Sequence, residues 1–332
     1  TTIVANTNPR EHAAMSGPGD FKPYDSGVTP RFQEIATFMR SQRHPIGPDV
    51  DIALAGVPFD LGATYRLGAR HGPPVTREAS RLIRAVNPAT KVAPFRLCNI
   101  ADVGDAPTHP MKVEESCDMI QGFYEEIHAA GAWPLSVGGD HTVPLPILRA
   151  IAKDRPLGLF HVDAHADTFD DFMGTRINHA TFVRRAVEEG LIDPKRTIQV
   201  GLRGTRYGDD DIGYGNEVGI TMVPMDEYEA MGREAFIKLA LEVLGDEPCY
   251  LTVDIDGLDP RDCPGTGVPE PGGIAMRDMQ VIFRSMMGIN AVGGDICEVS
   301  PPHDPIGITF VNVANMMFEM VCLMATNRSK AS

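Results

Sequence analysis

Residues 157–167 read LGLFHVDAHAD, an apolar run that ends in acidic and imidazole side chains. Short apolar runs without polar alternation are typical of strands buried on both faces, as in a parallel sheet. Residues two apart in an extended chain point to the same side, so Asp163, His165 and Asp167 face one point beyond the run. Because functional groups gather at the carboxyl ends of parallel strands, this stretch predicts a buried strand that carries a functional site.

The same kind of apolar run recurs along the chain, bounded by Gly, Pro or Asp. The other runs are 51–58, 97–104, 133–139, 197–204, 220–225, 249–256 and 291–299. Amphipathic stretches of helical period lie between them. Strands that alternate with helices predict right-handed crossovers and one α/β layer structure. No break in composition separates two cores, so we expect one domain over residues 49–332, preceded by an N-terminal extension or arm over residues 1–48.

Composition and charge limit the partners that are expected. Lys plus Arg number 30 and Asp plus Glu number 45, which gives a formal net charge of −15 and argues against nucleic acid and anionic membranes. No run approaches about 18 apolar residues, so no membrane span is expected. The first twenty residues lack the apolar region of a secretory signal, which predicts a cytoplasmic protein. Six scattered cysteines predict reduced, mostly buried thiols.

Two further apolar runs also end in groups that bind metals. Helix caps and turns would account for a single carboxylate, but several buried carboxylates repel one another unless a cation lies between them. The predicted metal ligands are His141, Asp163, His165, Asp167, Asp254 and Asp256. Six ligands exceed the need of one ion that keeps an open position, and four carboxylates balance two divalent cations. Carboxylate and imidazole ligands without thiolate favour two Mn2+ ions, with Ni2+ or Co2+ as alternatives.

Several motifs, in their order along the chain, resemble those of one family. They are PFDLGATYRLGARHGP at 58–73, GGDH at 138–141, DAHAD at 163–167, VDIDGLDP at 253–260 and EVSP at 298–301. This set is similar to the motifs of the ureohydrolases, which include arginase, agmatinase and guanidinobutyrase. The resemblance extends from about residue 51 to the end of the chain. In the arm, TPRFQEIATFMR at 29–40 is similar to the N-terminal region of guanidinobutyrase-like members.

The resemblance implies a three-layer, arginase-like α/β fold with a mostly parallel eight-stranded sheet and helices on both faces. It also implies a dimanganese centre with two bridging carboxylates. One ion would be held by His141, Asp163, Asp167 and Asp254, and the other by Asp163, His165, Asp254 and Asp256. The expected partner is a small guanidino substrate. A homo-oligomer, as a trimer or hexamer, is expected, and a hetero-oligomer with a paralogue is an alternative.

Three residues would carry the chemistry. Glu298 follows an apolar strand, and a carboxylate is the strong bidentate partner of a guanidinium group. By resemblance, Asp167 would orient the attacking hydroxide, while His179 would contact the substrate and protonate the departing amine, since imidazole titrates near neutrality. Family members commonly have glycine after this histidine, whereas this chain has Ala180, which would reshape the mouth of the site. The products would be urea and an amine.

Loops near 170–178 and 202–214 and the segment after Pro269 would select the guanidino substrate. Candidate partners for a substrate carboxylate are Arg176, Arg203 and Arg206. If none of them faces the site, agmatine, guanidine, or an alkylated guanidine or biguanide is favoured. We expect an agmatinase-type amidinohydrolase. A related single-metal deacylase and a catalytically silent partner subunit stay open as alternatives.

Overall fold

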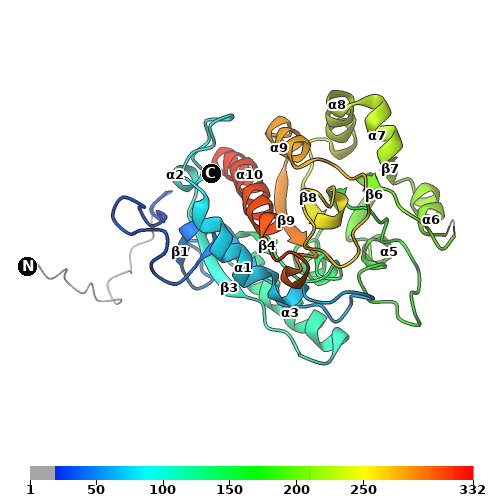
Figure 1. Ribbon diagram of the computed structural model, residues 1–332, viewed down its shortest axis with the longest axis horizontal. Helices are drawn as coiled ribbons and strands as arrows, with labels where there is room; N and C mark the ends of the chain where they lie inside the picture. Colours follow the sequence, from blue (N-terminus) through cyan, green and yellow to red (C-terminus); the bar gives the residue numbers. More distant parts are fainter. Residues whose placement is uncertain (1–18, 209, 332) are drawn as a thin grey trace, which may run out of the picture.

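A parallel β-sheet forms the centre of the protein (Figure 1). The computed structural model describes residues 19–208 and 210–331. Within these residues the sheet has nine strands in the order β1-β3-β2-β4-β9-β8-β5-β6-β7, and all neighbouring strands are parallel. The strands are β1 (Gln42–Arg43), β2 (Ile52–Gly56), β3 (Ile100–Asp105), β4 (Trp133–Val137), β5 (Leu157–Val162), β6 (Ile192–Leu202), β7 (Thr221–Pro224), β8 (Cys249–Asp254) and β9 (Ala291–Cys297).

The predicted α/β sheet is confirmed, since β2 to β9 correspond to the eight apolar runs. The sheet also contains β1, a ninth strand from the predicted arm, and it is entirely rather than mostly parallel. β1 has only two residues, both polar, and it pairs with β3 through Gln42 opposite Ala101. The Arg43 guanidinium donates to the Asp102 carbonyl at 3.0 Å. A strand held by such contacts has no apolar run by which the sequence could reveal it.

Helices cover both faces of the sheet, as the three-layer prediction requires (Figure 1). The helices are α1 (Gly72–Ala79), α2 (Pro94–Leu97), α3 (Val113–Ala129), α4 (Pro144–Ile151), α5 (Phe182–Glu188), α6 (Asp210–Val218), α7 (Met225–Met231), α8 (Arg233–Leu244), α9 (Met276–Ser285) and α10 (Ile308–Ala331). Residues of α8, α9 and α10 share one core with alternate strand residues such as Phe160, and residues of α3, α4 and α5 share the other with residues such as Leu159. All six cysteines, which lie within the described residues, are free and buried, as predicted.

The C-terminal helix α10 is apolar along most of its length. Residues Ile308–Lys330 have a mean hydropathy of 1.6 over an 18-residue window, so by length and composition this helix could cross a membrane, although the sequence showed no unbroken apolar run. In the fold 72% of that window is buried. Its Met316, Met317, Met320 and Met324 side chains pack in the core with α9 and β9. Burial against the sheet therefore accounts for the apolar character of α10.

The described part of the predicted arm, residues 19–48, packs against the edge of the sheet. Phe21 and Phe38 are buried, the Phe38 N–H donates to the Asp102 carboxylate at 3.0 Å, and the Met39 N–H donates to the Ser80 hydroxyl at 2.8 Å. Residues 1–18 lie outside the described residues. The division into an extension over residues 1–48 and a catalytic domain over residues 49–332 stays a prediction.

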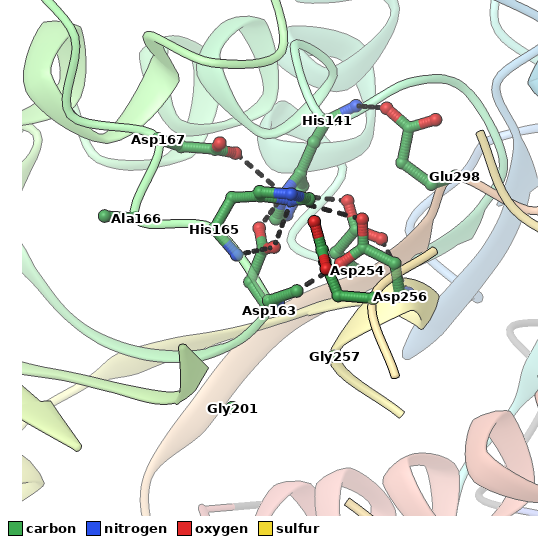
Figure 2. A network of polar contacts seen from close by, with 12 residues as sticks. His141, Asp163, His165, Ala166, Asp167, Gly201, Asp254, Asp256, Gly257 and Glu298 are labelled. Atoms are coloured by element: carbon green, nitrogen blue, oxygen red, sulfur yellow. Dashed lines mark hydrogen bonds and ion pairs between the residues drawn. The ribbon is translucent and has the colours of Figure 1, made fainter. Parts of the chain in front are cut away.

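Two glycines fix the backbone of Asp163 at the end of β5 (Figure 2). A Cβ at Gly257 would lie 2.7 Å from the Asp163 nitrogen, and a Cβ at Gly201, whose φ is +106°, would lie 2.7 Å from the Asp163 carbonyl oxygen. Real Cβ atoms do not approach backbone atoms this closely. The chain thus needs glycine on both sides of Asp163 to keep this carboxylate in position.

We expect Gly257→Ala to lower the free energy of unfolding by about 1–3 kcal/mol, because the added methyl group must displace the β5 backbone. Gly213→Ala is the matched control, since Gly213 lies exposed within α6 with open space around its Cβ position. The control should leave the free energy unchanged or raise it by up to about 1 kcal/mol. Denaturant titration of both variants measures the difference, and equal stability would contradict the close packing of Gly257 on Asp163.

Candidate metal centre and active site

The predicted ligands converge where four strands end. In the sheet, β4, β9, β8 and β5 are consecutive neighbours, so the residues that follow them meet at one edge. Figure 2 shows the convergent side chains, which are His141, Asp163, His165, Asp167, Asp254 and Asp256. All are buried except His165, which is about one-third exposed. The structure therefore brings together all six residues that the sequence singled out.

The donor atoms form two groups that share one carboxylate. In the first group, Nδ1 of His141 lies 2.8 Å from Oδ2 of Asp163 and 3.0 Å from Oδ2 of Asp167. In the second, Nδ1 of His165 lies 3.3 Å from Oδ1 of Asp163 and 3.2 Å from Oδ2 of Asp256. Each group has the side chains to hold one metal ion. Asp163 belongs to both, as expected of a bridging ligand.

Asp254 lies between these groups, with its Oδ2 atom 3.4 Å from Nδ1 of His141. Burial raises its pKa well above the usual range, and the charges of Asp256, Asp163 and Glu298 raise it further. Burial raises the pKa of Asp256 as well. Like charges crowded away from water are relieved by a cation between them. The electrostatics of Asp254 therefore fit a metal centre.

Asp163 and Asp167 differ in the support they receive from the protein. Burial opposes the charge of Asp163, but hydrogen bonds from His141, His161 and His165 outweigh it and lower its pKa well below the usual range. Burial and the Asp163 charge instead raise the pKa of Asp167 to about 7. The buried Oδ2 atom of Asp167 accepts no hydrogen bond within the described residues. A buried carboxylate oxygen without a donor also fits a cation as its partner.

His141 is oriented by a relay that the sequence did not reveal. The Thr252 hydroxyl donates its one proton to Oδ1 of Asp295 at 2.6 Å. In its 2.8 Å contact with Nε2 of His141, the hydroxyl oxygen is therefore the acceptor and Nε2 is the donor. Because Nε2 carries a proton, Nδ1 is the His141 atom that faces the carboxylates. Without metal Nδ1 donates to Asp163, and on loss of that proton its lone pair would be available to a cation. The Tyr250 hydroxyl holds the other Asp295 oxygen at 2.6 Å. Asp295 lies within the apolar run 291–299 with no spacing that marks it as a positioning residue, and threonine, like Thr252, is common in strands.

His161 lies inside the apolar run of β5, where a histidine that packs in the core is expected; it is fully buried, and it also supports Asp163. The Gln199 amide donates to Nδ1 of His161 at 2.7 Å. The proton of His161 therefore lies on Nε2, which donates to Oδ2 of Asp163 at 2.9 Å. Burial lowers the pKa of His161, consistent with a neutral ring. Its place before DAHAD in the sequence was the available signal for this role.

Glu298 and His179 form a hydrogen-bonded pair beside the carboxylates. Oε1 of Glu298 accepts from the backbone N–H of His141 at 3.0 Å and lies 3.0 Å from the ring nitrogen Nδ1 of His179. The opposite nitrogen of His179 lies 2.9 Å from the Thr64 hydroxyl, in the motif at 58–73. Burial alone would lower the pKa of His179, but the hydrogen bond and charge of Glu298 outweigh it and raise the pKa to about 9. His179 therefore holds a proton beside the cluster at neutral pH.

A cavity of about 310 Å³ opens over the carboxylates. His179, Ala180 and Glu298 line its inner part, and side chains from the predicted selectivity loops line its outer part. These outer residues are Phe169, Phe172, Thr205, Arg206, Tyr207, Val268 and Glu270. The ring centroid of Phe172 lies 5.2 Å from that of Phe169 and 5.7 Å from that of Tyr207. The cavity thus has a charged floor and a partly aromatic outer wall.

The three candidate arginines differ in what they contact. The Arg203 guanidinium donates to the carbonyls of Asp256 and Leu258 at 2.6 and 3.1 Å, so it fixes a loop. Arg176 is ion-paired with Asp170 at 2.9 Å and also contacts Glu188. Arg206 alone of the three lines the cavity, and it has no carboxylate within 4.0 Å among the residues whose side chains are described, which leave out residues 209–211.

The fold and the carboxylate cluster define a parallel α/β protein with a candidate metal centre. Residues 50–322 match the arginase family. Guanidinopropionase from Pseudomonas aeruginosa is 45% identical over 94% of this chain and 98% of that protein, and guanidinobutyrase from the same organism is 42% identical over 91% and 96%. The solved structure of proclavaminate amidino hydrolase from Streptomyces clavuligerus has a TM-score of 0.86 and 36% identity, over 90% of this chain and 100% of that chain. The chain therefore belongs to the arginase family, which confirms the resemblance.

Removing the charge of Asp254 should separate metal binding from stability. In metal-free protein, we expect Asp254→Asn to leave the melting temperature unchanged or to raise it. The neutral amide removes the cost of charging or protonating this crowded carboxyl group, and its oxygen can still accept from the backbone N–H of Asp256. Added Mn2+ should stabilise the wild type but scarcely the variant. Differential scanning fluorimetry after chelation and after metal addition measures both effects.

Asp304→Asn is the matched control for a buried aspartate with a structural role. Its two oxygens accept the N–H groups of Gly307 and Thr309 at the start of α10, at 2.8 and 2.7 Å. We expect this variant to lose about 1–3 kcal/mol of stability but to keep its response to Mn2+. An Asp254→Asn protein as unstable as the control without metal would contradict the charge-crowding argument.

Proposed function

We propose that the protein is a binuclear-metal amidinohydrolase that hydrolyses a small guanidino compound to urea and an amine. The observation that carries this proposal is one cavity in which Glu298 and His179 stand beside two metal-binding groups that share Asp163. The names of the relatives, guanidinopropionase and guanidinobutyrase, support the same reaction class. A single-metal deacylase would have no need of the second group of donors.

The six convergent residues would hold the two cations, with Asp163 and Asp254 in contact with both. Oxygen and imidazole donors favour Mn2+, with Ni2+ and Co2+ as the alternatives. When bound, such a pair of divalent cations supplies a hydroxide nucleophile near neutral pH. The predicted homo-oligomer and cytoplasmic location stay predictions.

The protein's own groups bind and orient the substrate. The Glu298 carboxylate carries the charge that a guanidinium group requires as a planar hydrogen-bonding partner. Asp167, whose buried Oδ2 atom lies 3.0 Å from Nδ1 of His141, orients the attacking water toward the guanidinium carbon. His179 keeps a proton up to about pH 9 and delivers it to the departing amine nitrogen. Glu298 contacts both the substrate and His179, so it couples binding to proton delivery.

We further propose that the preferred substrate is a guanidino acid, whose carboxylate pairs with Arg206 at the outer end of the cavity. Arg206 reaches the cavity without a carboxylate partner among the residues whose side chains are described, whereas Arg176 and Arg203 are bound elsewhere. With Glu298 and Arg206 lining the same cavity, the two charged ends of a short guanidino acid would each have a partner of opposite charge. Glu270 also lines this region, and it would be the counter-charge for the amine of agmatine.

The reaction is tested by urea release from metal-stripped protein reloaded with Mn2+, Ni2+ or Co2+. The substrate panel contains 3-guanidinopropionate, 4-guanidinobutyrate, agmatine, guanidine and a biguanide. We expect equal amounts of urea and amine from at least one guanidino acid, with activity falling as the pH rises through about 9, where His179 loses its proton. His179→Asn should lower kcat by about 10²–10⁴-fold and remove that alkaline decline. Urea from no compound with any metal would favour the deacylase or the silent subunit.

Arg206→Ala tests the substrate class separately from the reaction. We expect kcat/KM for guanidino acids to fall by about 10–100-fold, since a charge-assisted hydrogen bond is lost, while activity on agmatine is kept. Arg176→Ala is the matched control, because Arg176 is engaged with Asp170 and Glu188, and it should change neither value. Equal losses on agmatine and on guanidino acids would contradict a carboxylate-reading role for Arg206.

A further inference from the structure

A second cavity, of about 520 Å³, lies between the N-terminal arm and the body of the protein. One wall comes from arm residues 22–40, and the other comes from residues 83–85 and from α2. In Figure 1 the arm and α2 lie beside the β1 edge of the sheet, whereas the metal centre lies at the ends of the central strands. The two cavities share no lining residue among those described. The arm cavity is therefore a separate feature of the fold.

The arm cavity is strongly basic although the whole chain carries a net charge of −15. The cationic residues that line it are Lys22, Arg31, Arg40, Arg84 and Arg96. The only acidic residue lining it in the described part of the chain is Asp25. Across residues 19–208 and 210–331, none of the five cations has a carboxylate within 4.0 Å. In an acidic protein with many surface ion pairs, five unpaired cations around one cavity form a concentrated positive field.

Arg40 is the most constrained of these cations. It is only 5% exposed, and its guanidinium donates to neutral oxygens, the Ser26 hydroxyl at 2.8 Å and the Thr29 carbonyl at 2.6 Å. Its backbone has a φ of 59°, a left-handed conformation that is costly for a residue with a side chain. A buried cation without a counter-charge is also costly. The fold thus holds a guanidinium at the cavity wall that no carboxylate in the described part of the chain compensates.

The other walls fit a ligand that has both charge and an apolar body. Nε of Arg31 is buried and has no hydrogen-bond partner in the described part of the chain. Tyr24, Ile83 and Phe95 supply apolar surface between the cations. Guanidinium groups bind carboxylate and phosphate oxygens in a bidentate manner. The volume falls within the range of cavities that hold small organic molecules, about 300–1,000 Å³.

We infer that the arm cavity binds a small organic anion with two or more negative charges, carried by carboxylate or phosphate groups. The anion supplies the counter-charge that Arg40 lacks, and the exposed Arg84 and Arg96 close over it from α2 and the preceding loop. Bound there, it bridges the arm and the body of the protein. It therefore stabilises the position of the arm against the sheet.

Isothermal titration calorimetry of the metal-loaded protein with succinate and with 3-phosphoglycerate tests this site. Succinate reports on carboxylate pairs, 3-phosphoglycerate adds a phosphate group, and inorganic phosphate lacks the organic body. We expect one binding site per chain for at least one of the two organic anions, tighter than for inorganic phosphate and weakened as ionic strength rises. The double variant R84E/R96E should weaken binding at least about tenfold.

The double variant R155E/K238E is the matched control. Both of its residues are exposed and lie outside the cavity, and it changes the net charge by the same amount as R84E/R96E. It should keep the wild-type affinity, which separates a local site from the field of the whole protein. The inference would be overturned if neither organic anion bound, or if both double variants weakened binding equally. It would also be overturned if the sedimentation coefficient changed in R84E/R96E alone, because that result would assign the cavity to a second copy of the chain.

Discussion

The site depends on how the protein holds four carboxylates together where water scarcely reaches them. Asp163 is stabilised as an anion by three imidazoles, so its charge is balanced by the protein itself. Asp254 lacks comparable support, and its neighbours raise its pKa well above the usual range. The chain thus balances one part of the charge, and the proposed cations would balance the rest. Without metal, the least supported carboxylates can be protonated, which would let such a site fold before a cation binds.

The sequence was sufficient to predict the eight longer strands and the convergence of the candidate ligands, because both follow a short period. Strands buried on two faces are apolar runs, and Asp163, His165 and Asp167 alternate directly after one of them. β1 escaped prediction because it consists of two polar residues held by pairing with β3. Thr252 and Asp295 escaped as positioning residues because their role depends on contacts between β8, β9 and the segment after β4, which no local pattern records.

The candidate arginines illustrate a second limit of sequence reasoning. All three lie in or next to loops that line the site, and their chemistry is identical, so the sequence left them as equal alternatives. Arg203 has a structural role because its guanidinium donates to the backbone carbonyls of Asp256 and Leu258, which are distant in the sequence and close in the fold. Arg176 is distinguished by Asp170 and Glu188, which lie on either side of it in the chain. What separates a structural arginine from one that is free to bind a ligand is the position of its acceptors.

Two of the seven non-glycine residues with a positive φ in the described part of the chain are carboxylates of the proposed active site. Asp167 and Glu298 have φ values of 55° and 59°, and such conformations cost about 1–3 kcal/mol each for residues other than glycine. Each is held in place by the rigid structure around it: the Val183 N–H donates to the Asp167 carbonyl at 3.1 Å, and the Glu298 N–H donates to the Gly139 carbonyl at 2.8 Å. The two apolar cores on either side of the sheet offset this cost. Asp167 and Glu298 can point into one cavity in spite of this strain because each follows a strand of the sheet, and the two cores hold these strands in place.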